Sequence, residues 1–218
     1  MDLAVFDLDE TVICEDSTGL WLRWLVSQGF ARETLLAEKQ ALMTHYYAGT
    51  LAMENYMALT LSPLTGLAAP TVASWVRRWI QRDILPRVYP DARDRIQWHQ
   101  QRGDKVVICS ASGEHLVTPI AERLGAHGAL ATGVEVVNDR YSGLTYGTLT
   151  YKEGNVSRLT DWRALQHENA FHQTWAYSDS MSDLPLLAQA DHALVINPNR
   201  QLHQEALARG WEVCRWAR

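Results

Sequence analysis

The sequence has few cysteines, no excess of positive charge and no long apolar segment. Its three cysteines, Cys14, Cys109 and Cys214, show no CxxC spacing, which is typical of reduced thiols in the cytoplasm. A formal net charge of −5 argues against a protein dedicated to nucleic acids. The sequence contains no run of about 18 apolar residues, the length needed to span a membrane. The N-terminus also lacks the pattern of a signal peptide. We therefore expect a cytoplasmic protein that has no nucleic-acid or membrane partner.

The overall amino-acid composition is typical of a globular protein. The 218 residues are 47% hydrophobic and 21% charged, which suits one or two domains with a buried core. The eight histidines show no HxH or HExxH spacing, so we do not expect a metal site built from histidine.

Strand and helix patterns alternate along most of the chain. Short apolar segments predict buried strands at 3–6, 105–109, 174–177 and 192–196, with helices between them near 91–102, 154–166 and 200–209. A further strand is predicted at 129–132, and a hairpin at 134–137 and 140–145. This alternation predicts an α/β protein with a Rossmann-like, doubly wound, mostly parallel sheet.

One long segment departs from this alternation. Residues 17–85 show no strand pattern, and their helical periodicity predicts helices near 17–28, 32–47, 51–61 and 71–84. We therefore expect a catalytic core formed by residues 1–14 and 88–218, with an all-helical cap domain inserted at 15–87.

Polar side chains follow three of the predicted strands. Asp7 and Asp9 end the first strand, Ser110 ends the second, and Asp179 and Asp183 follow a third. Each cluster alone is commonly a helix cap or a turn. In parallel sheets, however, ligands bind at the carboxyl ends of the strands, where these three clusters would meet. Converging carboxylates need a cation, and their hard oxygen atoms suit Mg²⁺.

Three segments resemble the motifs of the haloacid dehalogenase superfamily. They are Phe6-Asp7-Leu8-Asp9-Glu10-Thr11-Val12, Ile108-Cys109-Ser110, and Tyr177-Ser178-Asp179-Ser180-Met181-Ser182-Asp183. The helical insertion directly after the first motif is similar to that of the phosphoserine-phosphatase-like branch, subfamily IB. The resemblance covers nearly the whole chain.

The resemblance implies a phosphoryl transfer through two carboxylates. Asp7 would attack phosphorus and form an aspartyl-phosphate, which splits one difficult step into two. Asp9 would protonate the leaving alkoxide and then deprotonate the attacking water. Family dehalogenases and phosphonatases lack this acid/base, so Asp9 favours a phosphatase or a phosphotransferase.

The resemblance also implies a metal and a phosphate site. Mg²⁺ would be bound by Asp7, the main-chain carbonyl of Asp9 and Asp179, while Asp183 would orient the site from the first or second shell of the metal. Hydroxyl donors to the phosphate oxygens would come from Thr11 and Ser110.

One position departs from the family pattern. Relatives usually carry a lysine after a glycine that opens a helix, whereas this chain has Asn155 after Gly154. Lys152 lies three residues earlier and Arg158 three residues later. We expect Lys152 to supply the missing charge from a shifted position, with Asn155 binding substrate. The alternative is that Lys152 is a solvated surface residue and that the site is weakened.

The expected substrate is a small phosphate ester that carries an amine. Asp16 lies nine residues after Asp7, where phosphoserine phosphatases have an acidic cap residue that binds the substrate amine; helix capping is its alternative role. The segment 56–59 lacks the arginine that those enzymes use for a carboxylate. Histidinol phosphate therefore fits at least as well as phosphoserine. A phosphotransferase and a binding or regulatory protein with a weakened site remain open, as does the oligomeric state.

Overall fold

The computed structural model describes residues 1–166 and 171–218. Over these residues the strands form one seven-stranded sheet in the order β4-β3-β2-β1-β5-β6-β7. The strands are β1 (Leu3–Asp7), β2 (Lys105–Gly113), β3 (Gly128–Val137), β4 (Arg140–Tyr146), β5 (Thr174–Ser178), β6 (His192–Ile196) and β7 (Glu212–Cys214). All neighbours pair in parallel except β3 and β4. The predicted α/β class is thus confirmed.

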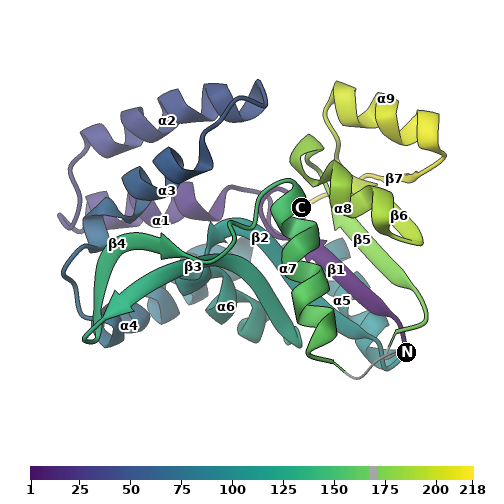
Figure 1. Cartoon of the computed structure of the whole chain (residues 1–218), viewed down its shortest axis with the longest axis horizontal. Helices are drawn as coiled ribbons and strands as arrows, with labels where there is room; N and C mark the ends of the chain where they lie inside the picture. Colours follow the sequence, from purple (N-terminus) through teal and green to yellow (C-terminus); the bar gives the residue numbers. More distant parts are fainter. Residues whose placement is uncertain (167–170) are drawn as a thin grey trace.

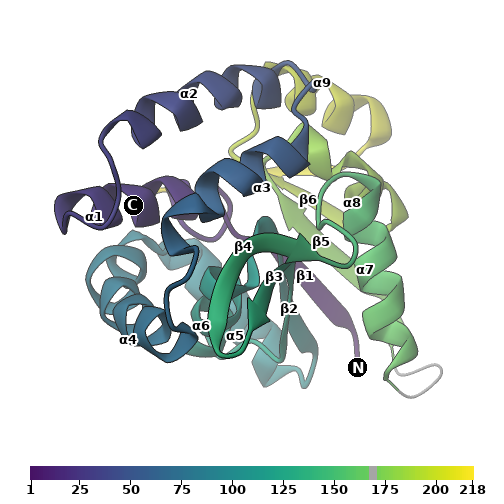
Figure 2. The ribbon, with the colours of Figure 1, turned by 60° about the vertical axis from the view of Figure 1, so that its left-hand side comes forward.

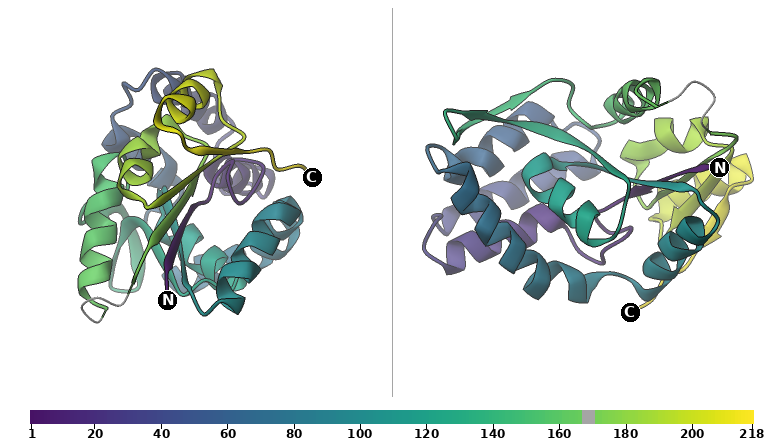
Figure 3. Two further views of the ribbon diagram at one scale, coloured as in Figure 1. Left: turned by 90° about the vertical axis from the view of Figure 1, so that its right-hand side faces the viewer. Right: turned by 90° about the horizontal axis from the view of Figure 1, so that it is seen from below.

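Helices cover both faces of this sheet, as expected for a doubly wound fold. Alternate side chains of β1 point to opposite faces. Ala4 and Phe6 share a core with α5 (Pro90–Gln101) and α6 (Glu114–Arg123). Leu3 and Val5 share a second core with α7 (Glu153–Ala164), α8 (Leu184–Gln189) and α9 (Arg200–Arg209). The right-hand view of Figure 3 shows α7 and α5 on opposite sides of the sheet.

The helices between β1 and α5 form a separate group, which we call the helical cap (Figure 1). Its members are α1 (Ser17–Ser27), α2 (Thr34–Tyr47), α3 (Met53–Leu61) and α4 (Ala69–Trp79), followed by a π-helical turn at Ile80–Ile84 and short 3₁₀ turns at Ser62–Leu64 and Leu85–Arg87. Tryptophans fill its interior: the buried rings of Trp21 and Trp79 lie 5.3 Å apart between centroids. None of the helices in the described ranges has the length and apolarity needed to cross a membrane.

Two short segments connect the helical cap with the sheet, side by side. The amide of Cys14 donates to the carbonyl of Arg87 at 3.0 Å, and the amide of Tyr89 donates to the carbonyl of Val12 at 3.0 Å. The chain therefore leaves the core and returns to it at one place. We propose the division of the chain into 1–14, 15–87 and 88–218 on this basis.

Two sequence predictions were wrong about strand limits. The strand expected at 105–109 continues to Gly113, so Ser110 lies inside β2 and not in a loop after it. The separate strands expected at 129–132 and 134–137 are one strand, β3. The apolar residues at 129–137 are interrupted only by Thr132, Gly133 and Glu135. Residues 130–134 are all buried, so the strand continues through Thr132 and Gly133.

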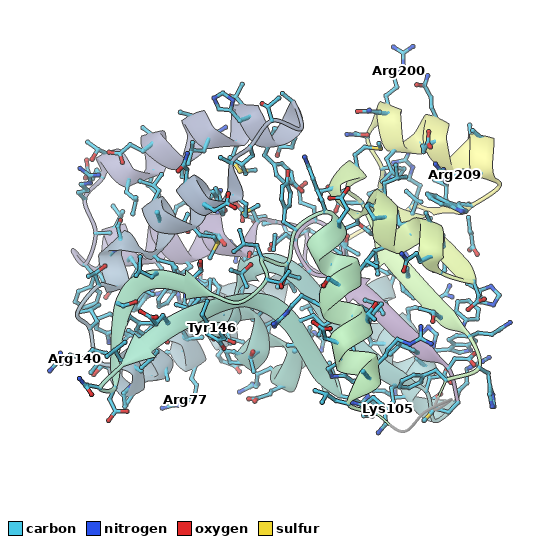
Figure 4. All side chains as sticks on the ribbon, viewed as in Figure 1. Arg77, Lys105, Arg140, Tyr146, Arg200 and Arg209 are labelled. Atoms are coloured by element: carbon cyan, nitrogen blue, oxygen red, sulfur yellow. The ribbon has the colours of Figure 1, made fainter. Side chains whose placement is uncertain are left out.

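The β3–β4 hairpin extends beyond the sheet and joins the helical cap. The amide of Gly66 donates to the carbonyl of Tyr141 at 2.8 Å, and the amide of Tyr141 donates to the carbonyl of Leu67 at 3.0 Å. Figure 2 shows α3 lying over this hairpin, and Figure 4 labels Arg140 and Tyr146 at the two ends of β4. The hairpin and the helical cap together enclose one side of the site.

Candidate active site

A cleft of about 770 Å³ lies between the helical cap and the carboxyl ends of β1, β2 and β5. Its lining is strongly acidic, with seven carboxylates: Asp7, Asp9, Glu10, Glu15, Asp16, Asp179 and Asp183. The predicted residues Ser110, Lys152 and Asn155 also line it. The structure therefore brings together residues that lie up to 176 positions apart in the sequence, counted from Asp7 to Asp183.

A tight turn after β1 positions the two leading carboxylates. The carbonyl of Leu8 accepts hydrogen bonds from the amides of Val12 (2.9 Å) and Ile13 (3.0 Å), and Glu10 has a positive φ of 59°. This turn keeps both Asp7 and Asp9 at the cleft. Burial raises the pKa of Asp7 well above its usual range, and the nearby charges of Asp183 and Asp179 raise it further.

Thr11 links two of the carboxylates. Its hydroxyl lies 2.8 Å from Oδ2 of Asp7 and 3.1 Å from Oδ1 of Asp179, and it accepts the amide of Asp179 at 3.0 Å. A hydroxyl has one proton, so it donates to only one of the two carboxylates at a time. The structure therefore places the buried Thr11 hydroxyl between these carboxylates, and its predicted contact with the phosphate stays a prediction.

Asp9 is held by donors on both of its oxygens. Oδ1 accepts the amide of Ser17 at 2.7 Å, and Oδ2 accepts the hydroxyls of Ser112 at 3.1 Å and Ser110 at 3.4 Å. Burial, with the charge of Asp16, raises the pKa of Asp9 to about 6, although the donors at Ser17 and Ser112 lower it. A carboxyl group with a pKa near neutrality can both give and take a proton.

Asp183 has both carboxylate oxygens occupied. Oδ1 accepts from the side-chain amide of Asn155, and Oδ2 accepts from the hydroxyl of Ser178. Burial raises the pKa of Asp183 to about 6 despite these donors. Its position suits a residue that orients the other carboxylates rather than one that binds substrate directly.

The donor chemistry of the site fits a magnesium ion. Asp7 and Asp179 are close enough to share the hydroxyl of Thr11, and burial raises the pKa of Asp179 to about 7. Across the described ranges, no three His, Cys, Asp or Glu side chains converge so as to hold a metal by themselves. Mg²⁺ commonly uses only one or two carboxylates and completes its shell with other oxygens, including water. Two carboxylates and the carbonyl of Asp9 would meet that need.

Lys152 and Arg158, the two candidates for the missing positive charge, and Asn155, which occupies the usual lysine position, lie in different places. The Lys152 ammonium donates to the carbonyl of Gly49, just after α2, at 2.9 Å across the cleft. Asn155 is buried in the first turn of α7 and donates to Asp183, as described above. Arg158 donates to the carbonyl of Ala131 at 3.1 Å, away from the residues that line the cleft.

A close backbone approach explains the glycine before Asn155. A Cβ atom on Gly154 would lie 1.9 Å from the carbonyl oxygen of Leu149, so only glycine fits there. Lys152 adopts a positive φ of 53° in the same turn. This turn presents both Lys152 and Asn155 to the cleft at the start of α7.

Asp16 does not act as a helix cap. It occupies the N-cap position of α1, but its carboxylate accepts no hydrogen bond from the helix. It forms an ion pair with Lys39 of α2 instead. The capping role considered for Asp16 from its sequence position is therefore not observed.

Two residues that contact the site, Ser112 and Lys39, were not predicted from the sequence, and Tyr46 was predicted only as one of several aromatic residues that line the pocket or fill the core of the cap. Ser112 contacts Asp9 and could have been found, because it follows Ser110 at the i+2 spacing that shares a strand face. Tyr46 hydrogen-bonds with Ser180 at 2.8 Å and so connects α2 with the loop after β5. Lys39 gives no signal, since a lysine on a helix ordinarily faces solvent.

Comparisons with known proteins agree with this geometry. The sequence matches the haloacid dehalogenase-like hydrolase family over residues 4–188. It is 34% identical over 217 residues to a histidinol-phosphatase of Neisseria meningitidis serogroup C, which covers 97% of each chain. A solved Bordetella pertussis protein of unknown function superimposes with a TM-score of 0.89 at 31% identity, again over 97% of each chain. A phosphoserine phosphatase trapped as a phospho-aspartyl intermediate analogue superimposes with a TM-score of 0.72 at 19% identity, over 100% of this chain and 94% of that one, which supports the fold alone.

The chain therefore belongs to the haloacid dehalogenase-like hydrolases. Relatives in that family include a histidinol-phosphatase and a phosphoserine phosphatase, and this chain is an enzyme of the same class, a phosphoric monoester hydrolase.

Proposed function

We propose that this protein is a Mg²⁺-dependent phosphomonoesterase that cleaves a small, amine-bearing phosphate ester through an aspartyl-phosphate on Asp7. The observation that carries the proposal is the pairing of two differently held carboxylates at one cleft. Asp7 shares a hydroxyl with Asp179, whereas Asp9 is held by donors at Ser17 and Ser112. These surroundings suit a nucleophile beside a metal and a separate acid/base.

The reaction follows from these two environments. A carboxylate oxygen of Asp7 attacks phosphorus, and the bond from phosphorus to the ester oxygen breaks. Asp9, whose pKa of about 6 leaves a protonated fraction near neutrality, gives its proton to the departing oxygen. Asp9 then takes a proton from the water that attacks the aspartyl-phosphate, which releases phosphate and restores Asp7.

Mg²⁺ bound by Asp7, Asp179 and the Asp9 carbonyl would screen the repulsion between the phosphate and the nucleophile. Asp183 would position this group through Ser178 and Asn155. Ser110, Thr11 and Asn155 stay candidate phosphate contacts, and Lys152 is the cation that we propose for the transition state.

Two features support a small, amine-bearing substrate. The volume of the cleft suits a small metabolite and is too small for a macromolecule. Asp16 lines the same cleft as Asp9, and its charge helps to raise the pKa of Asp9, so we assign Asp16 to the substrate amine. The relative in Neisseria meningitidis, a histidinol-phosphatase, makes histidinol phosphate the first substrate to test. The three free cysteines agree with the cytoplasmic location that we propose.

The test is a screen of the purified protein against a panel of phosphate esters with Mg²⁺. We expect hydrolysis of an amine-bearing ester, loss of activity with a chelator, and thermal stabilisation by BeF₃⁻ with Mg²⁺, which mimics the phosphorylated aspartate. Candidate acceptor alcohols in the same assay would reveal phosphoryl transfer. Absence of Mg²⁺-dependent hydrolysis, even of a generic aryl phosphate, would contradict the proposal and favour a binding protein.

A further inference from the structure

Lys39 is a buried lysine on a helix that is otherwise mostly exposed. It is only 7% exposed, and Leu35, one turn earlier, is the other buried residue of α2. Among all the lysines and arginines that the structure describes, Lys39 alone is buried. A buried charge needs a partner, so its neighbours should reveal what it does.

The partner of Lys39 is Asp16, the residue that we propose binds the substrate amine. The Lys39 ammonium contacts Oδ2 of Asp16, and the Asp16 side chain remains 31% exposed toward the cleft. Within the described residues Oδ1 of Asp16 accepts no hydrogen bond. One carboxylate oxygen is therefore occupied by an ammonium group of the protein, while the other is open.

The surroundings keep this subsite attractive to a cation even with Lys39 present. Glu10 lies near Asp16, whose charge raises the pKa of Glu10, whereas the charge of Lys39 lowers it. Two carboxylates, Asp16 and Glu10, thus lie with one ammonium group in the same lining, and the net charge of these three groups is negative.

We propose that Lys39 is a specificity-determining residue: it shares the Asp16 carboxylate with the ammonium group of the substrate and so weakens the binding of amine-bearing esters. This inference rests on the proposed function, because it assumes that Asp16 contacts the substrate amine. Lys39 stays in place when substrate binds, since displacing it would leave a buried charge without a partner. The substrate ammonium takes the open oxygen and is repelled by Lys39 at short range.

The test compares one amine-bearing ester with its uncharged analogue. Histidinol phosphate and its deamino counterpart, in which hydrogen replaces the ammonium group, differ only at the group that Asp16 would bind. The measured quantity is the ratio of the two KM values, because any change in Asp9 chemistry alters both esters alike. Lys39→Met should lower the KM for the amine-bearing ester by roughly three- to tenfold and leave that of the analogue unchanged.

Two controls accompany this variant. Lys39→Arg keeps the charge and should keep the wild-type ratio. Arg23→Met removes one positive charge from the same cleft, but Arg23 is exposed and pairs with Glu15 at 2.9 Å, so the ratio should again not change. If Lys39→Met does not fold, Lys39→Gln provides the same loss of charge with a polar side chain of similar length.

The outcomes separate this inference from the proposed function. If Lys39→Met raises KM for both esters equally, Lys39 is only structural and the inference is wrong. If it raises KM for the amine-bearing ester alone, Lys39 supports Asp16 and the inference is again wrong, although the amine site stands. If Asp16→Asn changes both esters alike, the proposed amine class fails and the inference fails with it.

Discussion

The two sides of the cleft are built by different means. On the sheet side, the carboxylates of Asp7, Asp9 and Asp183 each accept hydrogen bonds from groups close in the fold, so their positions are fixed by several contacts. On the side of the helical cap, Lys39 and Tyr46 each depend on one or two contacts made by a single helix, α2. On this basis we propose that the sheet side carries out the chemistry, whereas the helical cap selects the substrate.

Replacing the nucleophile should give the largest effect and test the sheet side directly. Asp7→Asn should lower kcat by more than about 10³-fold, since no other group can form the covalent intermediate. The protein should stay folded and gain thermal stability in a chelator, because the substitution removes one of several mutually repelling carboxylates. Steady-state kinetics and a thermal melt measure both effects.

The control for Asp7→Asn is its response to BeF₃⁻. The wild-type protein should be stabilised by BeF₃⁻ with Mg²⁺, whereas Asp7→Asn should not be. Retained turnover in this variant would place the nucleophile elsewhere and would end the assignment of chemistry to the sheet side.

Removing Lys152 should give the second largest effect. Loss of one preorganised charge-stabilising donor typically costs about 3–4 kcal/mol, or roughly 10²–10³ in kcat, and Lys152→Ala should fall in that range. Asn155→Ala should cost less, because a neutral amide offers only a hydrogen bond. Arg158→Ala should be nearly silent, since its side chain points to the carbonyl of Ala131.

A rescue experiment sharpens this result. Asn155→Lys should restore activity in the Lys152→Ala background if the two positions reach the same phosphate. A Lys152→Ala enzyme with wild-type kcat/KM would mean that Lys152 serves only to contact Gly49 of the cap. The role of Lys152 would then be structural and not catalytic.

The same division explains what could be predicted from the sequence. Strands of the sheet are short apolar runs, and their ends carry Asp7, Asp9 and Asp179 at spacings that local geometry determines. The fold class was predicted on that basis and the family from the resemblance of three motifs, and both are confirmed. Asp7 and Asp9 were predicted to share the cleft because residues i and i+2 of an extended segment face the same way.

On the cap side, Asp16 was predicted from the family resemblance, but the contacts of Lys39 and Tyr46 could not be, because they join elements that are distant in sequence. Lys39 meets Asp16 only through the packing of α2 against α1, and nothing local marks a lysine that becomes buried. The hydrogen bond from Tyr46 to Ser180 spans 134 positions. The limits of β2 and β3 were missed for another reason: Ser110 and Thr132 are polar, yet their hydroxyls bond within the fold and let the strands continue.

The stability of the protein should depend on pH through the sheet side. In the folded protein the pKa values of Asp9 and Asp183 are raised to about 6 and that of Asp179 to about 7, above those of the unfolded chain. The folded state therefore binds protons between pH 5 and 7 that the unfolded state does not, so stability is highest at the acidic end and is lost as pH rises. In a chelator, the melting temperature should fall by on the order of 5 °C from pH 5 to pH 8.

Magnesium should reduce this pH dependence, because a bound cation compensates the carboxylates at high pH. Asp179→Asn should also make the profile in a chelator flatter, since it removes the carboxylate with the highest of these three pKa values. Melting curves across the pH range, with and without Mg²⁺, measure both effects. If the melting temperature in the chelator did not change with pH, burial would not raise the pKa values of the sheet-side carboxylates.

The smallest effect should come from the cap, at Tyr46. Its hydroxyl hydrogen-bonds with Ser180 at 2.8 Å and Ser182 at 3.3 Å, and these two serines also bond each other at 2.9 Å. Tyr46→Phe removes the link between α2 and the loop after β5, but the serines keep a partner, so the cost should be about 0.5–1.5 kcal/mol. We expect kcat/KM to fall by roughly two- to fivefold, mainly through KM, because the cap would close less firmly over an unchanged set of carboxylates. Tyr47→Phe is the matched control, since Tyr47 is 67% exposed and should tolerate the same loss. A fall in kcat as large as that of Lys152→Ala would show that the cap positions Asp179 and Asp183 through this loop, and the two sides of the cleft would then act as one unit.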